Sequence, residues 1–140
     1  MTAAFRHPFV RVLRNCLIAA AVIAPLNVGR HAHFYNEMGA MRTLTTIHTA
    51  EARYFSQFGN FAVSLKELAS VDDTLSDVAR TRNSHGYRFT LSRTARGYTI
   101  DANPIRLGAP GIRNFFSDQT LALHQHYGPE PATAADPLVK

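Results

Sequence analysis

The chain contains one cysteine, Cys16, among its 140 residues, so an intramolecular disulfide is excluded and the redox compartment is left open. A lipid-modified cysteine follows an apolar stretch, whereas Cys16 stands at the start of one. We therefore interpret Cys16 as a small apolar residue of that stretch. The length accommodates one domain with a short segment at each end.

Acidic residues are absent from the first 30 positions, which hold four arginines, Arg6, Arg11, Arg14 and Arg30. The rest of the chain has eleven Lys and Arg against ten Asp and Glu, so the excess positive charge lies in the amino-terminal segment. Nucleic-acid binding depends on a basic surface of the domain itself. A nearly neutral domain therefore argues against nucleic acid as a partner, and we interpret the arginines as a targeting signal.

A long apolar run is also missing. The uncharged run before Arg30 has fifteen residues, which at about 1.5 Å each reach about 22 Å, less than the ~30 Å hydrocarbon core of a membrane. Signal peptides have such lengths, but they end at a small-x-small cleavage site, and Pro25 disfavours one here. We expect residues 1–29 to form an uncleaved signal-anchor, with Phe9 and Leu13 extending its apolar surface.

The arginines before the apolar segment predict an amino terminus in the cytoplasm and the remainder of the chain outside it. Pro25 lies within this segment. Because proline lacks a backbone N–H, it should kink or interrupt a helix here.

Motifs for common catalytic chemistry are absent as well: there is no Gly-rich phosphate loop, Gly-x-Ser-x-Gly elbow, Cys-x-x-Cys or His-Glu-x-x-His. The candidate metal ligands are two pairs, His31-x-His33 and His124-x-His126. Residues two apart on a strand share a face, so His124 and His126 could bind one ion, but a third ligand has to come from elsewhere. We expect this pair to face solvent, with no metal or cofactor bound.

The acidic residues offer two further alternatives. Asp72, Asp73 and Asp77 suggest a calcium loop, but the glycine and the terminal glutamate of the known loop are missing, which favours a solvated loop or a helix cap. Asp101 and Asp118 are expected at the edges of a sheet, without a second group for acid–base catalysis. We therefore expect no enzymatic activity.

The spacing of apolar residues predicts a helix that continues out of the anchor and stops at Gly59-Asn60. Its apolar stripe should face a sheet or another helix, with the aromatic residues at its end packed in the core. The stripe consists of Met41, Leu44, Ile47, Ala50, Tyr54, Phe55 and Phe58. The opposite face carries Arg42, Thr45, Thr49, Glu51 and Arg53.

The residues that follow predict a short helix and then two antiparallel hairpins. Ser64-Leu65-Lys66-Glu67 fits a capping box, and Val71–Ser84 is interpreted as a loop with one helical turn. Alternation of apolar and polar residues indicates strands at 87–92, 98–102, 114–117 and 121–127. Pro104 should end strand pairing. The segment after Gly128 is polar and rich in proline, so we expect it to be flexible and unpacked.

Three stretches resemble type IV pilins and pseudopilins. NEMGAMRTLTTIHTAEARY at 36–54 is similar to the "NEA…LRTINTAE…Y" that follows the membrane-spanning half of the first helix in these proteins. YFSQFGNFAVSLKELAS resembles the segment after that helix. GYRFTLS…GYTIDANP…G…RNFFSDQT resembles the sheet pattern "GYxFxY…YxxxAxP…G…RxFFxDxSG". Leu121 stands where that pattern has its last glycine, so we expect this turn to be built differently.

The processing signals of the resembled family are missing. Its peptidase cuts after a glycine, and a glutamate follows that neutralises a neighbour's terminal amine during assembly, since an unpaired buried charge is costly. This chain has no glycine before Gly29 and no acidic residue before Glu37. Cleavage and charge-guided docking of the usual type are therefore not expected.

The resemblance implies an α+β, pilin-like fold, in which an amino-terminal helix packs on a four-stranded antiparallel sheet with a small helix between them. We divide the chain into an anchor at 1–29, a helix-and-sheet domain at 30–127 and a flexible tail at 128–140. The expected location is the bacterial inner membrane, with the domain in the periplasm or outside the cell.

The implied function is a non-enzymatic structural subunit that assembles with like subunits, or with other pilins and pseudopilins, in a pilus or secretion system. We expect the membrane and assembly contacts at Phe9, Leu13, Leu17, Val22 and Ile23. One alternative is an exported or tethered periplasmic binding module that kept the domain and lost assembly. A second is a histidine–metal enzyme, which would require stoichiometric metal and a loss of activity on mutation of His124 and His126.

Overall fold

The structure is a computed structural model that describes residues 9–106 and 112–140, with side chains from residue 32 onward. It divides the chain into two compact units, Met1–Phe34 and Tyr35–Lys140. All members of the buried apolar cluster belong to the second unit.

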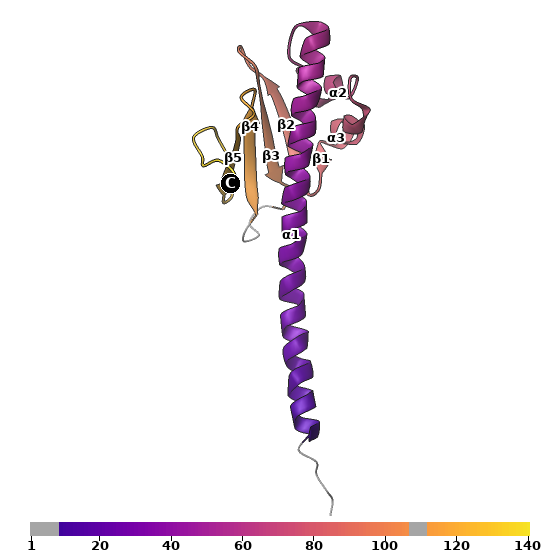
Figure 1. The fold of residues 1–140 in the computed structure, drawn as a ribbon, viewed down its shortest axis with the longest axis vertical. Coiled ribbons are helices and arrows are strands. Elements are labelled where there is room, and N and C mark those ends of the chain that lie inside the picture. Colours follow the sequence, from indigo (N-terminus) through magenta and orange to yellow (C-terminus); the bar gives the residue numbers. More distant parts are fainter. Residues whose placement is uncertain (1–8, 107–111) are drawn as a thin grey trace, which may run out of the picture. The chain divides into compact units, whose positions relative to one another are not determined.

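Helix α1 spans Phe9–Phe58 (Figure 1). The helix runs through Pro25, so an interruption at this residue is a wrong prediction, since a proline removes only one backbone hydrogen bond of a long helix. The alternative, a kink at Pro25, stays a prediction. The predicted stop is confirmed. Gly59 adopts a left-handed φ of 71°, and its N–H donates to the Phe55 carbonyl at 2.8 Å, which closes the last turn of the helix.

The sheet is antiparallel and has five strands in the order β1-β2-β3-β4-β5, so the expected four-stranded sheet is a wrong prediction. The added strand is β1, with only two residues, Asn83–Ser84. The others are β2 (Tyr87–Arg93), β3 (Tyr98–Pro104), β4 (Arg113–Asp118) and β5 (Leu123–Tyr127). Pairing of β3 with β2 ends at Pro104, as expected.

The backbone around β1 explains why this strand was not foreseen. Arg82, His85 and Gly86 all adopt positive φ values, of 58°, 49° and 74°. These turns reverse the chain, so that Ser84 pairs with Tyr87 and Asn83 with Arg88. Two of the three residues are not glycine, and the sequence carries no pattern that predicts a left-handed arginine or histidine.

The core lies between α1 and the sheet. Alternate residues of β2 and β3, such as Phe89, Leu91 and Ile100, turn toward α1 and meet Leu44 and Ile47 of its apolar stripe. The stripe is buried at these positions, as predicted. The expectation fails at the last turn, where Phe55 and Phe58 are 46% and 54% exposed.

The chain after α1 supplies the aromatic residue that does pack on the core. Phe61 is partly buried, and its ring centroid lies 5.0 Å from that of Tyr98 on β3 and 4.7 Å from that of Phe55. The return of the chain at Gly59 therefore places Phe61 against the sheet, while Phe55 lies on the outer side of this stack.

Short helices connect α1 to the sheet. Helix α2 (Leu65–Leu68) is capped by Ser64, whose hydroxyl accepts the Glu67 amide at 3.3 Å, as the capping box predicts. The Glu67 carboxylate reaches back to the amide of Val63 rather than Ser64. The expected loop after it holds a 3-10 helix η1 (Asp73–Leu75) and helix α3 (Ser76–Thr81).

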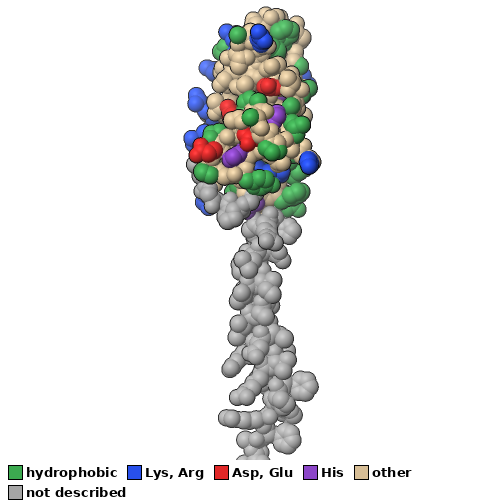
Figure 2. Space-filling model, turned by 90° about the vertical axis from the view of Figure 1, so that its left-hand side faces the viewer, with side chains coloured by type: hydrophobic (Ala, Val, Ile, Leu, Met, Phe, Trp, Pro, Cys, Tyr) green, Lys and Arg blue, Asp and Glu red, His purple; other side chains and the backbone are tan. Residues whose placement is uncertain are grey.

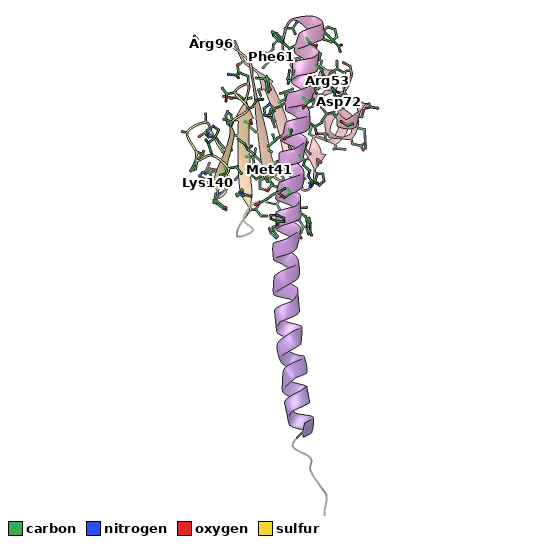
Figure 3. All side chains as sticks on the ribbon, viewed as in Figure 1. Met41, Arg53, Phe61, Asp72, Arg96 and Lys140 are labelled. Carbon is green, nitrogen blue, oxygen red and sulfur yellow. The ribbon has the colours of Figure 1, made fainter. Side chains whose placement is uncertain are left out.

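This connecting segment is tied to α1 by an ion pair. Arg53 Nη1 donates to Asp72 Oδ2 at 2.9 Å, and Figure 3 labels the two residues beside each other near α1. Asp72 also accepts the amide and the hydroxyl of Thr74, so it caps η1. The interpretation of this acidic stretch as a helix cap is therefore confirmed for Asp72.

The segment after Gly128 packs against β5, contrary to the expectation that it would not. Ala132 is buried, the Gln125 amide donates to the Pro137 carbonyl, and the Val139 amide donates to the Leu123 carbonyl, both at 2.9 Å. The tail thus runs beside β5 as an irregular partner strand. The tail is held by hydrogen bonds to the backbone groups of β5, which its polar, proline-rich sequence does not predict.

Candidate functional site: a polar joint between α1 and the sheet

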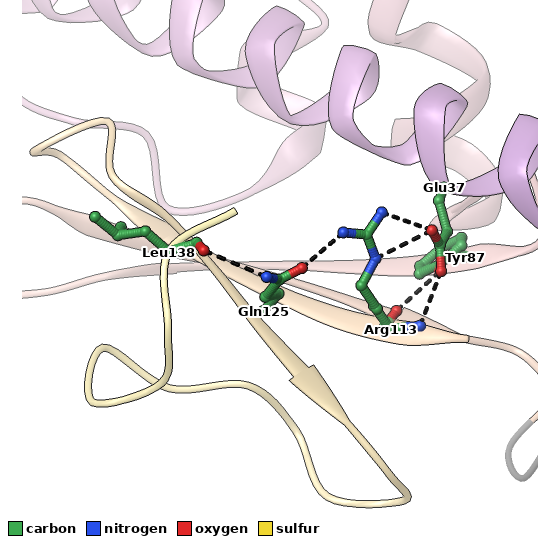
Figure 4. Close-up of polar contacts among 5 residues, drawn as sticks. All are labelled: Glu37, Tyr87, Arg113, Gln125 and Leu138. Carbon is green, nitrogen blue, oxygen red and sulfur yellow. Dashed lines mark hydrogen bonds and ion pairs between the residues drawn. The ribbon is translucent and has the colours of Figure 1, made fainter. Parts of the chain in front are cut away.

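The most extensive buried polar network begins at Glu37 on α1. This residue is 6% exposed, and both of its carboxylate oxygens accept hydrogen bonds from Arg113, the first residue of β4 (Figure 4). The Arg113 amide donates to Oε1 at 3.1 Å, while Nε and Nη2 donate to Oε2 at 3.0 and 2.7 Å. The charge-assisted bonds attach the helix to one particular strand.

Arg113 extends the network to the other strands. Its Nη1 donates to Gln125 Oε1 on β5 at 2.6 Å, and Gln125 Nε2 donates to the Leu138 carbonyl in the tail at 3.3 Å. The Tyr87 hydroxyl on β2 donates to the Arg113 carbonyl at 2.8 Å. We name these five residues, Glu37, Tyr87, Arg113, Gln125 and Leu138, the polar joint.

The electrostatics of the polar joint indicate a fixed ion pair rather than a proton donor and acceptor. Burial acts to lower the pKa of Arg113, but the hydrogen bonds and the negative charge of Glu37 outweigh it and raise that pKa. Burial also raises the pKa of the Tyr87 hydroxyl. Neither group exchanges a proton near neutral pH, so the joint is suited to holding two elements together and not to acid–base chemistry.

The role of Glu37 bears on assembly. Both of its oxygens are engaged by Arg113 of the same chain. A carboxylate paired in this way does not offer a free charge to the terminal amine of a neighbouring subunit. The expectation that charge-guided docking is lost stays a prediction.

A second buried cluster joins α1 to β3 and β4. His48 Nδ1 lies 2.7 Å from the Tyr98 hydroxyl, and His48 Nε2 lies 2.8 Å from Ser117 Oγ. Serine, histidine and tyrosine in contact could suggest an activated nucleophile. The Ser117 hydroxyl, however, donates to the Ala122 carbonyl at 2.8 Å.

This direction of donation decides the role of the cluster. Because the Ser117 hydrogen points at a carbonyl, His48 Nε2 must donate to Ser117, and Nδ1 must accept from Tyr98. Burial lowers the pKa of His48, which Asp118 partly opposes, and burial raises the pKa of Tyr98 to about 12. A neutral histidine that donates to serine is not its base. The cluster is therefore structural, and no motif in the sequence predicts it.

A hollow of about 560 Å³ lies beside His48. The threonine hydroxyls on its α1 wall, Thr45 and Thr49, donate to carbonyls one turn earlier in their own helix. The hollow therefore has few polar groups left to orient a ligand. Its lining consists of Thr45, His48, Thr49, Ala52, Phe61, Tyr98, Gln119 and Leu121.

Glu51 is a buried acid, although the sequence pattern predicts it on the face of α1 opposite the apolar stripe. It was expected on the solvent side of α1, but it is 0% exposed, with Oε2 accepting the Ala62 amide at 3.0 Å. No partner of Oε1 occurs in the described part of the chain. Burial raises the pKa of Glu51 to about 7, with the Ala62 bond opposing and the charge of Glu67 adding to the shift.

The histidine pair on β5 is covered by the tail. His124 Nδ1 lies 2.7 Å from the Asp136 carbonyl, and His126 Nδ1 lies 2.9 Å from Asp136 Oδ1. Both side chains are partly buried, so the expectation of a solvent-facing pair is not met. Within residues 32–106 and 112–140, no group of three or more His, Cys, Asp or Glu side chains is arranged to hold a metal ion.

Charged groups of both signs are mixed on the surface. Figure 2 draws the side of the domain that carries β5 in Figure 1, and there basic, acidic and histidine side chains alternate over short distances. Asp118 accepts the amide and hydroxyl of Thr120, and Asp101 is half-buried, with a pKa raised by burial. No hydrogen bond among the described residues joins Asp101 and Asp118 to each other or to another acid.

The predicted membrane and assembly contacts, Phe9, Leu13, Leu17, Val22 and Ile23, lie outside the residues whose side chains the structure describes. The same applies to the anchor at 1–29. In the described residues, no helix combines the length and the apolar character required to cross a membrane.

A scan against protein-family models finds no match, and searches of curated proteins and of solved structures find none either.

Proposed function

We propose that this chain is a non-enzymatic structural subunit, similar to type IV pilins and pseudopilins, anchored in a bacterial inner membrane through residues 1–29. The sheet domain then lies in the periplasm or outside the cell. The observation that supports the proposal is α1 itself, one helix from Phe9 to Phe58 that contains both the apolar segment and the residues packed on the sheet.

The proposed mechanism assigns separate tasks to the two parts of α1. The apolar positions Phe9, Leu13, Leu17, Val22 and Ile23 hold the subunit in the membrane and offer a packing surface to like subunits. The polar joint keeps the later part of α1 attached to β4, so a force on the helix reaches the domain through Glu37 and Arg113. Assembly in this scheme depends on apolar packing rather than on a terminal amine.

Anchoring is tested with the full-length chain carrying a carboxy-terminal tag in a Gram-negative host. We expect mass spectrometry to show the uncleaved amino terminus, and the protein to resist alkaline extraction from the inner membrane. Leu17→Arg or Ile23→Arg should move the protein to the soluble fraction, because an arginine at the centre of a membrane-spanning helix costs about 2.5–3.5 kcal/mol of insertion free energy. Leu121→Arg, at a 64% exposed position, is the control that should leave the membrane fraction unchanged.

Assembly is tested separately by mechanical shearing and by oxidative cross-linking through Cys16, the one native cysteine. We expect cross-linked dimers in membranes, and their loss in Cys16→Ser. Full-length protein that stays in the inner membrane and never appears in sheared material or cross-linked dimers would contradict assembly. That outcome would favour the tethered binding module instead.

A further inference from the structure

The outer edge of β2 is only partly paired. Strand β1 pairs with Tyr87 and Arg88, the first two residues of β2, and stops there. Beyond them the Phe89 amide donates to the Arg82 carbonyl at 2.8 Å. The remaining residues of β2 up to Arg93 have a partner strand, β3, on one side only.

The alternation of a strand identifies which backbone groups face this edge. The Gly86 carbonyl accepts the Ile105 amide, and the Thr94 amide donates to the Gly97 carbonyl, so even-numbered residues bond toward β3. Odd-numbered residues therefore point outward, as the Phe89 amide does. The amides and carbonyls of Leu91 and Arg93 face outward, and no backbone partner for them occurs among the described residues.

A groove of about 400 Å³ lies along this edge. Its lining comes from the start of α2, the end of α3 and the middle of β2. Val63, which is 46% exposed, forms an apolar part of the wall. The lining consists of Val63, Ser64, Leu65, Lys66, Ala79, Arg82, Phe89, Thr90 and Leu91.

The charge of the groove selects its occupant. Lys66 and Arg82 line it, both are exposed, and neither forms an ion pair among the residues described. A second copy of this chain docked edge to edge would bring the same cations against them, which is unfavourable. A segment with carboxylates would instead complement the groove.

We propose that this groove binds an extended acidic segment of a partner protein, which adds a strand to the free edge of β2. Backbone groups of Leu91 and Arg93 bond to the segment, and Lys66 and Arg82 face its carboxylates. At about 3.3 Å per residue the free edge accommodates roughly five residues. The proposal concerns the domain alone and stands whether or not the chain is anchored or assembles.

The test uses full-length protein and a fluorescent peptide of about seven residues with alternating glutamate and valine. We expect saturable binding below about 1 mM. Amide hydrogen exchange should slow at Leu91 and Arg93, which face the peptide, and much less at Thr90 and Ser92, which already bond to β3. A peptide with N-methylated backbone amides should not bind, because it cannot form the ladder.

Charge is tested with the double variant Lys66→Gln, Arg82→Asn, in which asparagine tolerates the left-handed backbone of residue 82. Loss of two exposed favourable charges should weaken binding about tenfold. Arg96→Glu is the matched control, since Figure 3 places Arg96 at the tip of the β2–β3 hairpin. Its affinity should stay within about twofold of the wild type.

The proposal would be overturned by the absence of binding at about 1 mM peptide, the weakest affinity that it supports. Binding that leaves amide exchange at Leu91 and Arg93 unchanged would also overturn it. So would equal affinity for a peptide with lysine in place of glutamate. A self-association that slows exchange at the same two amides without peptide would likewise overturn it, in favour of a second copy as the occupant.

Discussion

Glu51 is the single residue whose environment differs most from that of a solvated acid. It lies in the core with one oxygen on the Ala62 amide and the other without a described partner. A carboxylate in this position loses hydration and regains only one hydrogen bond, which favours the neutral form. The residue therefore keeps its proton at pH values where ordinary glutamates are ionised.

The raised pKa of Glu51 predicts a loss of stability as the pH rises. Below its ordinary pKa of 4.5 the folded and unfolded chains both hold the proton; between 4.5 and about 7 only the folded chain does. Glu51 should therefore lower the free energy of unfolding by about 3 kcal/mol as the pH rises through this range. Urea unfolding at pH 5 and pH 8 should show a smaller fall in Glu51→Gln, whereas Glu130→Gln should match the wild type.

Glu37 and Arg113 test how much the polar joint stabilises the domain. Glu37→Gln leaves a largely buried guanidinium without its counter-charge, so we expect a loss of about 2–4 kcal/mol in urea unfolding. The pair of Arg80 and Asp77 is the control, with side chains 74% and 88% exposed. Asp77→Asn should cost less than about 0.5 kcal/mol. Equal effects of the two variants would contradict a stabilising role for burial of the first pair.

Leu121 occupies a backbone conformation that glycine favours, with φ of 65°. The Asp118 carbonyl accepts the Leu121 amide at 2.9 Å. The expectation that this turn differs from that of the resembled family stays a prediction. A leucine in the left-handed conformation destabilises the fold by about 1–2 kcal/mol relative to glycine. Part of this cost is offset because leucine has less conformational entropy than glycine in the unfolded chain.

Leu121→Gly should therefore raise the free energy of unfolding by about 0.5–1 kcal/mol. Leu121→Ala removes the same exposed side chain and keeps the strain, so it separates the two effects. A glycine variant no more stable than the alanine variant would show that the turn is not strained. Thermal unfolding of both proteins measures the difference.

Among the elements, the tail depends on Asp136. This residue accepts the Thr133 amide and hydroxyl and also contacts His126. The His126 and Thr133 bonds lower the pKa of Asp136, so its contribution is present above pH 3.8 and is lost as the pH falls through the lowered value.

Asp136→Ala should release the tail from β5. Amide exchange of Gln125 and Val139, whose bonds join the two segments, should become faster, while exchange of core residues such as Phe89 should not change. Asp73→Ala removes an exposed acid elsewhere and is the control. Unchanged exchange at Gln125 would show that the Asp136 contacts do not hold the tail.

At the scale of the whole molecule, the proposed division of α1 predicts that anchoring and domain stability vary independently. Glu37→Gln weakens the attachment of α1 to β4 without altering residues 1–29. The full-length variant should therefore remain in the membrane fraction at wild-type level, while protease digestion of its domain becomes faster. Loss of Glu37→Gln from the membrane fraction would show that anchoring requires the polar joint.

The amino-acid pattern alone predicts the elements with strong local signals: the end of α1 before Gly59, the cap at Ser64, and the strands that begin at Tyr87 and Tyr98. These depend on hydrogen bonds and alternation within a few residues, which a local pattern encodes. The resemblance to pilins likewise comes from the sequence, and the assembly it implies is still a prediction.

Which polar residues are buried, and what they contact, follows from the packing of distant segments and not from local pattern. Glu37 meets Arg113 across 76 positions, and His48 meets Ser117 across 69. Glu51 faces the core although its neighbours Arg53 and Thr49 face solvent. A polar side chain becomes favourable inside a protein when a partner arrives from a distant segment, and no local pattern specifies that partner.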